Sequence, residues 1–319
     1  MDVAKVAVII VNYNAGELLS GNLPRILESV KEGVQLKLFI VDNQSTDQSV
    51  EHLTHAIATH QLEEQVTLIQ ADKNGGFAYG NNVGFKAALD SGFDPDYFYL
   101  LNPDAYPEQA CFEEVLKLSS IHQNCAIIGS AVADESGELA ASRFIFPSIV
   151  SELYRGASLN LILRLFPRAQ IALPTAAIAT QCDWVSGAGF LIPKKVFNIL
   201  GNMDQGYFLY YEEVDYMFHA KQNSVPVFQC PTSKVTHIGG YSTGLANNRS
   251  ATKVPVYWYQ SWYRFFNKNY GRSYAVLAGV AWITGRMLNN LLALVVAKRR
   301  RDDGHRITAF IKHAILGKS

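Results

Sequence analysis

The sequence is poor in cysteine, and its few cysteines lie far apart. The 319 residues include 4 cysteines, at Cys111, Cys125, Cys182 and Cys230. These spacings exclude a zinc knuckle, and so few cysteines cannot form the disulfide framework of a secreted domain. We therefore expect free, buried thiols in a reducing compartment.

The sequence also lacks a signal peptide and an uninterrupted membrane-spanning run. The apolar stretch in the N-terminal "MDVAKVAVIIVNYN" is short and passes directly into a polar turn, unlike a secretory signal. Tyr274–Ala297 is strongly apolar but contains Arg286, Asn289 and Asn290. A central arginine costs about 2.5–3.5 kcal/mol on insertion into a bilayer. We therefore expect a cytoplasmic protein whose apolar C-terminal helix lies in the membrane interface or packs on the core.

Charged residues make up only 18% of the chain and are unevenly distributed. Residues 1–252 hold 16 Lys and Arg against 26 Asp and Glu, whereas residues 253–319 hold 12 against 2. The acidic part argues against nucleic-acid binding, and the basic, aromatic tail predicts peripheral binding to an anionic membrane surface. The tail also has an apolar helical face (Ile307, Phe310, Ile311, Ala314, Ile315) with basic neighbours (Lys298–Arg301, Arg306, Lys312, Lys318).

Apolar strand patterns alternate with helical patterns through the first half of the chain. Continuous β-branched runs are typical of strands buried on both faces, and repeated β-α units predict a parallel, doubly wound α/β sheet. The predicted strands are Val6–Val11, Leu36–Val41, Val66–Gln70, Tyr97–Leu101, Trp184–Ile192 and Val225–Cys230; the predicted helices run to about Val30, over Gln48–Thr59 and over Tyr79–Leu89. Residues 131–180 give a weak signal, which indicates an excursion over the surface.

Polar turns follow the predicted strands, and ligands bind at this edge of such sheets. Tyr13 offers a ring on which a nucleobase can stack, although it also suits a plain turn. Asp42 stands several residues before the cap of the next helix, which can be Ser45, Thr46 or Asp47. Its carboxylate is therefore available to accept from a uracil or thymine imide. Asn74 and Asn81 stand in "DKNGGFAYGNNVGF", where glycines allow a close backbone approach to a ligand.

Three further side chains are candidates for catalysis or metal binding. Pro103 restricts the backbone of "NPD" and holds Asp104 beyond the sheet edge, where it either binds Mg²⁺ or Mn²⁺ or is simply solvated. The run "YYEEVD" places Glu212 and Glu213 at the edge of the core, which suits a general base. We expect Glu212 to share a helix face with Asp215 and Glu213 to point elsewhere.

Two more residues complete the candidate set. Trp184 precedes a Ser-Gly-Ala-Gly turn and can wall a sugar pocket. His237 precedes Gly239 and Gly240 in a loop. A lone histidine is usually structural, but this one can complete a metal shell as a neutral imidazole.

The ordered motifs resemble a known enzyme family. "VIIVNYN", "VDNQSTD", "NGGFAYGNNVG", "NPD", "WVSGAGFLI", "YYEEVD" and "HIGGYSTG" together are similar to inverting glycosyltransferases of family two, in the rhamnosyltransferase-like branch that builds bacterial surface polysaccharides. The resemblance covers about residues 4–245. It implies a GT-A fold with a mixed, mostly parallel sheet, a nucleotide-diphosphate sugar donor and Mg²⁺ or Mn²⁺.

The resemblance also implies roles for the candidate residues. Glu213 would be the base, with Glu212 beside it in place of the usual Glu-Asp. Asp104 would be the last acid of the family's Asp-x-Asp metal motif, whose first acid is here Asn102, and His237 would be a further metal contact. The donor would contact Tyr13, Asp42, Asn43, Asn74, Asn81, Trp184 and Glu212.

The implied reaction moves a sugar, L-rhamnose from dTDP-rhamnose as first choice, to a hydroxyl of a lipid-linked saccharide. A UDP-sugar donor is the alternative. A sugar nucleotidyltransferase would need a glycine-rich basic loop that "VIIVNYNAGELL" lacks, and an inactive donor-binding subunit also remains. We expect a catalytic domain over residues 1–252 and a helical, membrane-associating region over residues 253–319. The sequence leaves the oligomeric state open.

Overall fold

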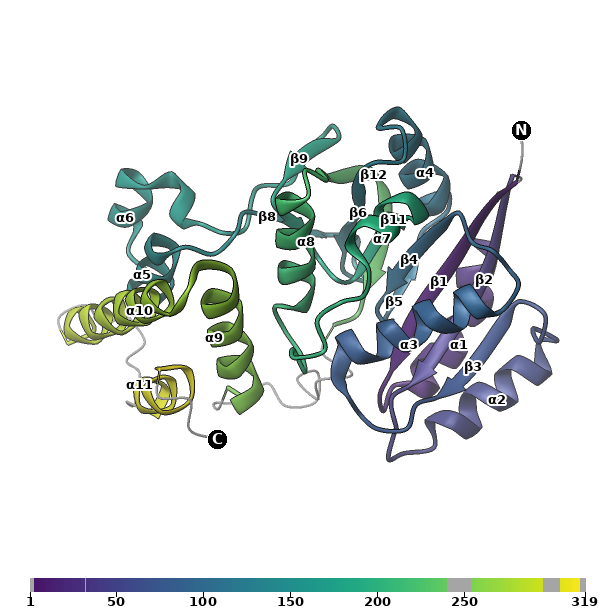
Figure 1. Cartoon of the computed structure of the whole chain (residues 1–319), viewed down its shortest axis with the longest axis horizontal. Coiled ribbons are helices and arrows are strands. Elements are labelled where there is room, and N and C mark those ends of the chain that lie inside the picture. Colours follow the sequence, from purple (N-terminus) through teal and green to yellow (C-terminus); the bar gives the residue numbers. More distant parts are fainter. Residues whose placement is uncertain (1–2, 32, 240–253, 295–304, 316–319) are drawn as a thin grey trace.

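The computed structural model describes residues 3–31, 33–239, 254–294 and 305–315. A ten-stranded sheet forms the centre, with helices on both faces, and further helices gather at one end of the molecule (Figure 1). The strand order is β3-β2-β1-β4-β11-β6-β12-β5. The main strands are β1 (Ala4–Asn12), β2 (Val34–Asp42), β3 (Val66–Gln70), β4 (Tyr97–Leu101), β5 (Ala105–Pro107), β6 (Ile127–Ala133), β11 (Gly189–Pro193) and β12 (Val227–His237).

The first four of these strands form a parallel block, as the alternating pattern predicted. β1 pairs in parallel with β2 and β4, and β2 pairs in parallel with β3. Alternate β1 side chains enter two separate cores, with Val6 and Val8 in one and Ala7 and Ile9 in the other. The strand is therefore buried on both faces, which explains its continuous β-branched run.

Each face of the sheet is covered by its own helices. One core contains buried residues of α1 (Gly16–Glu28), α2 (Ser49–Thr59) and α4 (Cys111–Ile121). The other contains buried residues of α3 (Gly76–Asp90), α7 (Lys194–Leu200) and α8 (Glu212–Gln222). We call the sheet with these six helices the sheet region.

Two strand predictions were wrong in extent. The predicted strand Trp184–Ile192 is two strands, because residues 186–188 turn between β10 (Trp184–Val185) and β11. β10 pairs with β8 (Arg143–Phe144) in a separate two-stranded sheet. The predicted Val225–Cys230 strand continues instead to His237, since a register shift between Cys230 and Lys234 accommodates Pro231.

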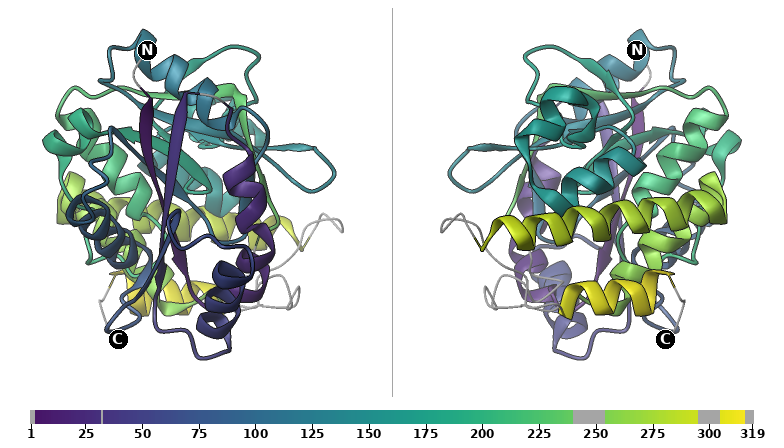
Figure 2. Two further views of the ribbon diagram at one scale, coloured as in Figure 1. Left: turned by 90° about the vertical axis from the view of Figure 1, so that its right-hand side faces the viewer. Right: turned by 90° about the vertical axis from the view of Figure 1, so that its left-hand side faces the viewer.

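The helices at the end of the molecule come from two distant parts of the chain. We call them the helical layer: α5 (Ile149–Ala157), α6 (Asn160–Leu165), α9 (Val256–Tyr270), α10 (Arg272–Leu292), α11 (His305–Ala309) and the following turn η2 (Phe310–Ile315). α5 packs closely along α10 (Figure 2). A Cβ added at Gly285 of α10 would lie 2.4 Å from the Leu153 carbonyl oxygen, and one at Gly156 would lie 2.2 Å from that of Trp282. Residues 131–180 are therefore not only a surface excursion.

The C-terminal residues differ from the expected lipid-facing helix. Phe310 and Ala314 are fully buried, and the Phe310 ring lies 4.7 Å from that of Trp262 and 4.4 Å from that of Trp282. This apolar side therefore packs inside the protein. Lys298–Arg301, Lys318 and the side chains of Arg306 and Ile315 lie outside the described residues.

α10 begins near the predicted start of the apolar C-terminal run and packs one face on α5. Its buried residues include Ala275, Ala278, Trp282 and Asn289. Within the described parts of the chain, no helix is both long enough and apolar enough to cross a bilayer.

Candidate active site

A cavity of about 560 Å³ lies at the carboxyl edge of the parallel strands. Loops after β1, β2 and β4 form one side of it, and the β10–β11 turn and the segment before α8 form the other. Ligands bind at this edge of open α/β sheets. The lining residues are Val11, Tyr13, Asn43, Asn74, Gly76, Phe77, Asn102, Pro103, Asp104, Ser186, Gly187, Ala188, Phe208, Leu209, Tyr210, Glu212, Glu213 and His237.

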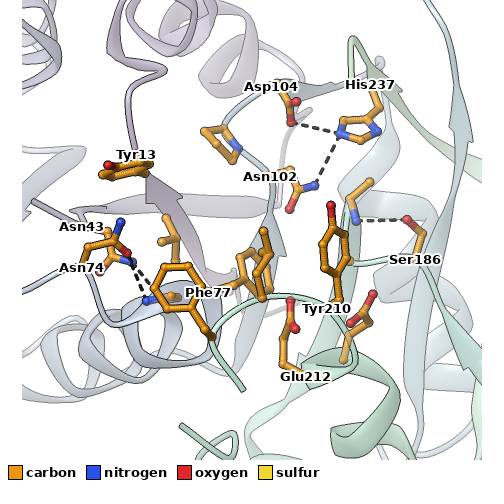
Figure 3. Close-up of a pocket in the computed structure, with 18 residues that line it drawn as sticks. Tyr13, Asn43, Asn74, Phe77, Asn102, Asp104, Ser186, Tyr210, Glu212 and His237 are labelled. Atoms are coloured by element: carbon orange, nitrogen blue, oxygen red, sulfur yellow. Dashed lines mark hydrogen bonds and ion pairs between the residues drawn. The ribbon is translucent and has the colours of Figure 1, made fainter. Parts of the chain in front are cut away.

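Tyr13, Asn43 and Asn74 lie on one side of this cavity (Figure 3). The Asn43 amide nitrogen donates to Asn74 Oδ1 at 3.3 Å and to the Gly76 carbonyl at 2.9 Å. Gly76 has a φ of +82°, and a Cβ there would lie 1.8 Å from the Phe208 carbonyl oxygen, so the position requires glycine. The structure thus brings three of the predicted donor residues together.

Asp42 lies beside the cavity but is not among its described lining residues. Its side chain is buried, and the carboxylate accepts hydrogen bonds from the Asn12 amide at 2.8 Å and from the Ser45 backbone and hydroxyl at 3.0 and 2.6 Å. In this arrangement Asp42 fixes the loops that follow β1 and β2. Its predicted contact with a base remains a prediction.

Asn81 and Trp184 also lie outside the described cavity lining. Asn81 is fully buried on α3 and donates to the Phe77 carbonyl at 2.9 Å. Trp184 stacks on Phe144 with ring centroids 4.0 Å apart, and its indole N–H donates to the Ile145 carbonyl at 3.0 Å. Both side chains support neighbouring backbone in this structure.

Asp104 and His237 form a pair on the opposite side of the cavity from Tyr13 (Figure 3). Short strand β5 follows the "NPD" turn and pairs antiparallel with β12, which sets Ala105 opposite His237. Asp104 Oδ1 therefore lies 3.0 Å from His237 Nε2, and the Asn102 amide nitrogen lies 3.4 Å from the same nitrogen. The two predicted metal ligands are thus adjacent, although they stand 133 residues apart in the chain.

Glu212 and Glu213 both line the cavity from the first turn of α8. Burial raises the pKa of both carboxyl groups, and that of Glu212, only 5% exposed, is raised further by the charge of Glu213. No hydrogen-bond partner within the described residues satisfies Glu212 Oε2 or Glu213 Oε2. Two carboxylates with free, buried oxygens facing one cavity suit proton transfer.

The expectation that Glu213 points away from Glu212 was wrong, because both carboxyl groups line the cavity and Asp215 is not among its described lining residues. Asp215 is buried and accepts hydrogen bonds from Lys268 at 2.6 Å, Asn269 at 2.8 Å and the Tyr207 hydroxyl at 3.0 Å. Lys268 and Asn269 belong to α9. Asp215 therefore ties the catalytic end of α8 to the helical layer.

The backbone before α8 adopts an unusual conformation. Tyr210 and Tyr211 have φ values of +69° and +68°, in the left-handed region, which costs about 1–3 kcal/mol per residue for non-glycine residues. The Ser261 hydroxyl of α9 holds this segment by donating to the Leu209 carbonyl at 3.0 Å. The Phe77 backbone N–H donates to the Phe208 carbonyl at 2.9 Å. The strained turn aims the first turn of α8 at the cavity.

Asp204 adds a second connection between this segment and α9. Its carboxylate accepts from Arg264 Nη2 at 2.7 Å and from Lys268 at 2.7 Å. Burial alone would raise the pKa of Asp204, but the hydrogen bonds from the two cations together outweigh it and lower the pKa to about 2. The wall of the cavity is thus held by charged residues from beyond position 253.

Several lining residues were missed from the sequence. Phe77, Phe208 and Leu209 form an apolar wall of the cavity. Residues 186–188 fall within the predicted strand Trp184–Ile192 and in the predicted Ser-Gly-Ala-Gly turn, but neither prediction placed them in the site. "YFLYY" gave only the signal of a buried aromatic run. Nothing in its local pattern indicated a turn with two left-handed residues, because α3 and α9 impose that conformation.

The chain is similar to known glycan-synthesising proteins. The profile described as glycosyl transferase family 2 matches residues 7–181. A low-salt glycan biosynthesis hexosyltransferase of Haloferax volcanii is 26% identical over 233 residues, which span 72% of this chain and 66% of that protein. An N-acetylglucosaminyl-diphospho-decaprenol L-rhamnosyltransferase of Mycobacterium tuberculosis is 24% identical over 250 residues, which span 74% of this chain and 77% of that protein.

A solved structure is similar in fold. The crystal structure of GalNAc-T7 with UDP, GalNAc and Mn²⁺ superposes with a TM-score of 0.57 at 13% identity, covering 98% of this chain and 54% of that one. At this identity the likeness concerns the fold alone, and together with the mixed, mostly parallel sheet it confirms the predicted GT-A fold. The family profile covers more than half of the chain, so the predicted resemblance is confirmed: the protein belongs to glycosyl transferase family 2.

Proposed function

We propose that the protein is an inverting glycosyltransferase of glycan biosynthesis. It would move a sugar from a nucleotide diphosphate to a hydroxyl of a lipid-linked saccharide. The observation that carries this proposal is a single cavity lined both by the adjacent Asp104 and His237 side chains and by the carboxyl groups of Glu212 and Glu213.

The residues present fit a divalent cation that is coordinated partly by protein side chains and partly by the diphosphate of the donor. Cis ligands of an octahedral Mg²⁺ at about 2.0–2.1 Å lie about 3 Å apart, and Asp104 Oδ1 and His237 Nε2 are 3.0 Å apart. The described residues hold no cluster of three or more His, Cys, Asp or Glu side chains for a metal, so diphosphate oxygens would complete the shell. Asp104 and His237 would hold Mg²⁺ or Mn²⁺, which when bound supplies positive charge at the leaving diphosphate.

Glu213 would act as the base. Its carboxylate takes the proton of the acceptor hydroxyl while that oxygen attacks the anomeric carbon and the bond to the diphosphate oxygen breaks. A single displacement inverts the configuration. Burial raises the pKa of both carboxyl groups, and two interacting carboxyl groups titrate as a pair. One of them would therefore hold a proton while the other ionises, and the motif assigns the ionised role to Glu213.

The donor would lie between these groups and the Tyr13 side of the cavity. The Tyr13 ring would stack on the base, and the Asn43 and Asn74 amides would contact the ribose and diphosphate. We propose dTDP-rhamnose as the donor, supported by the similarity to the Mycobacterium tuberculosis rhamnosyltransferase. Residues 1–252 would form the catalytic domain, and residues 253–319 would associate with the inner face of the cell membrane.

A thermal-shift screen of nucleotide sugars with and without Mn²⁺ tests the donor, because a ligand that binds the native state raises its Tm. dTDP-rhamnose should raise the Tm more than UDP-sugars do, and Mn²⁺ should enlarge the shift. A larger shift with UDP-sugars would reassign the donor.

Substitutions at the two ends of the cavity test the chemistry. Glu213→Gln should lower kcat by about 10²–10⁴-fold, the usual contribution of a general base, and keep the donor-induced Tm shift. Asp104→Ala should abolish both transfer and the Mn²⁺-dependent part of that shift. Asp134→Asn, in an exposed turn, is the control and should change neither. Undiminished transfer by Glu213→Gln would rule out its role as base.

A further inference from the structure

The outer face of α10 carries an unusually continuous row of exposed apolar side chains. Leu277 is 56% exposed, Met287 56%, Leu291 63% and Leu294 64%. The exposed apolar row consists of Val276, Leu277, Val280, Met287, Leu288, Leu291 and Leu294. With a rotation of 100° per residue, these positions fall within about 120° around the helix axis and extend over about 27 Å along it.

Packing among the described residues does not explain this row. The opposite face of α10, with Ala278 and Gly285, is the one that packs on α5. Phe310, which the sequence placed on a lipid-facing helix, fills the space between Trp262 and Trp282 instead. The apolar surface that the helical layer leaves uncovered is therefore on α10.

α6 extends this apolar surface at the same end of the molecule. Figure 1 shows α6 and α10 at the same end of the molecule, the end farthest from α2, with α5 between them. Leu161 is 62% exposed, Leu165 67% and Phe166 52%. Single exposed apolar residues are ordinary, but several gathered on two neighbouring helices mark an interaction surface.

The charges around this surface all have one sign. In residues 149–178, 254–294 and 305–315 the only acidic residue is Glu152, which is buried and paired with Arg155. The exposed basic side chains of the same segments include Arg164, Arg168, Arg272 and Lys312. An apolar row within a basic surface fits an anionic bilayer. It does not fit a second copy of itself, because like charges would face each other.

We propose that the outer faces of α6 and α10 form one membrane-docking surface that lies in the plane of an anionic bilayer. The leucines would enter the boundary between headgroups and acyl chains, and the arginines would contact lipid phosphates. The proposal rests on the membrane association proposed above and assigns it to α10 and a segment of the middle of the chain. Lipid binding is measured without donor or acceptor, so its failure would leave the sugar-transfer proposal standing.

Vesicle flotation of the full chain tests this surface. The protein should float with phosphatidylcholine vesicles that contain 30% phosphatidylglycerol, and much less with phosphatidylcholine alone. Leu277→Gln with Leu291→Gln should reduce flotation at least about tenfold, since two large apolar side chains no longer leave water. Leu161→Gln with Leu165→Gln should also reduce it. Ile121→Gln, at an apolar side chain of α4 that is 66% exposed, is the matched control and should leave it unchanged.

Unchanged Tm values would show that the variants fold, as expected for substitutions at exposed positions. Two results would overturn the proposal. One is flotation that survives both double substitutions. The other is a wild-type protein that floats with neither kind of vesicle but sediments as a dimer, with dimerisation lost on substitution of Leu277 and Leu291. That result would identify the surface as an interface with a second copy of the chain.

Discussion

The sheet region and the helical layer both bury apolar faces, but they differ in how far apart in the sequence the packed elements lie. In the sheet region β1, β2 and β3 are each followed by a helix that packs on the parallel block, so neighbours in sequence there are neighbours in space. In the helical layer α5 packs on α10, more than a hundred residues further along the chain. The first kind of packing leaves a periodic signal in the sequence, and the second leaves only small residues at the crossing, such as Gly156 and Gly285.

The two regions also differ in charge, and residues of both line or hold the cavity. The sheet region supplies Asp104, His237 and the two glutamates. The helical layer supplies Lys268 and Arg264, which hold the segment that carries the cavity wall. An acidic catalytic half and a basic helical half are thus joined by ion pairs at the point where their charges complement each other.

The largest effect on stability is expected at the crossing of α5 and α10. Gly285→Ala should lower the free energy of unfolding by about 1–3 kcal/mol, the usual effect of overpacking, because its Cβ would meet the backbone of α5 at 2.4 Å. Gly21→Ala is the control, since it lies within α1 with nothing within 4 Å of an added Cβ. That substitution should stabilise the protein by about 0.5–1 kcal/mol. Thermal unfolding of both variants measures the difference, and similar Tm shifts would contradict it.

The second test compares Lys268, which pairs with the buried Asp215, with Lys221, which forms an exposed ion pair. Lys268→Met should lower kcat about tenfold and lower the Tm, because Asp215 stays buried after losing its cation. Lys221→Met is the control: this exposed lysine lies 3.5 Å from Asp183, and exposed pairs contribute at most about 1 kcal/mol. Steady-state kinetics and thermal unfolding check both. Equal effects of the two substitutions would mean that α9 does not support the site.

The third test concerns pH within the sheet region. Burial raises the pKa of Glu212 well above 4.5, so the unfolded chain releases this proton at a lower pH than the folded protein does. Stability is therefore lost as pH rises above about 4.5. Glu212→Gln removes this loss of stability, so its Tm should exceed that of the wild type at pH 7–8. The Tm should rise by about 2–4 °C for each kcal/mol of unfolding free energy regained.

The pH dependence itself provides the check. The Tm advantage of Glu212→Gln should shrink toward pH 4, where the folded and unfolded states both hold the proton. Glu135→Gln, in an exposed turn, should show no such trend. A constant advantage at every pH would indicate a packing effect and contradict the assignment to proton linkage.

Residue patterns predicted the parallel block well, because its strands are buried on both faces and its turns stand next to them in the chain. Val66–Gln70 and Tyr97–Leu101 were predicted to the residue. The same patterns marked Asp104, Glu212 and Glu213 as candidate site residues, and the structure brings all three to one cavity. The strand through Pro231 was not foreseen, because a bulge that depends on β6 permits it. Likewise, the burial of Phe310 depends on Trp262 and Trp282, which no local period shows.

The pairing of β5 with β12 has a consequence for how the protein folds. Asp104 and His237 come together only after a chain of more than a hundred residues has closed on itself. Contacts between distant residues form late, because the entropy of closing the loop is lost before the contact is gained. A partly folded chain would therefore form the Tyr13 side of the cavity before Asp104 and His237 meet across it.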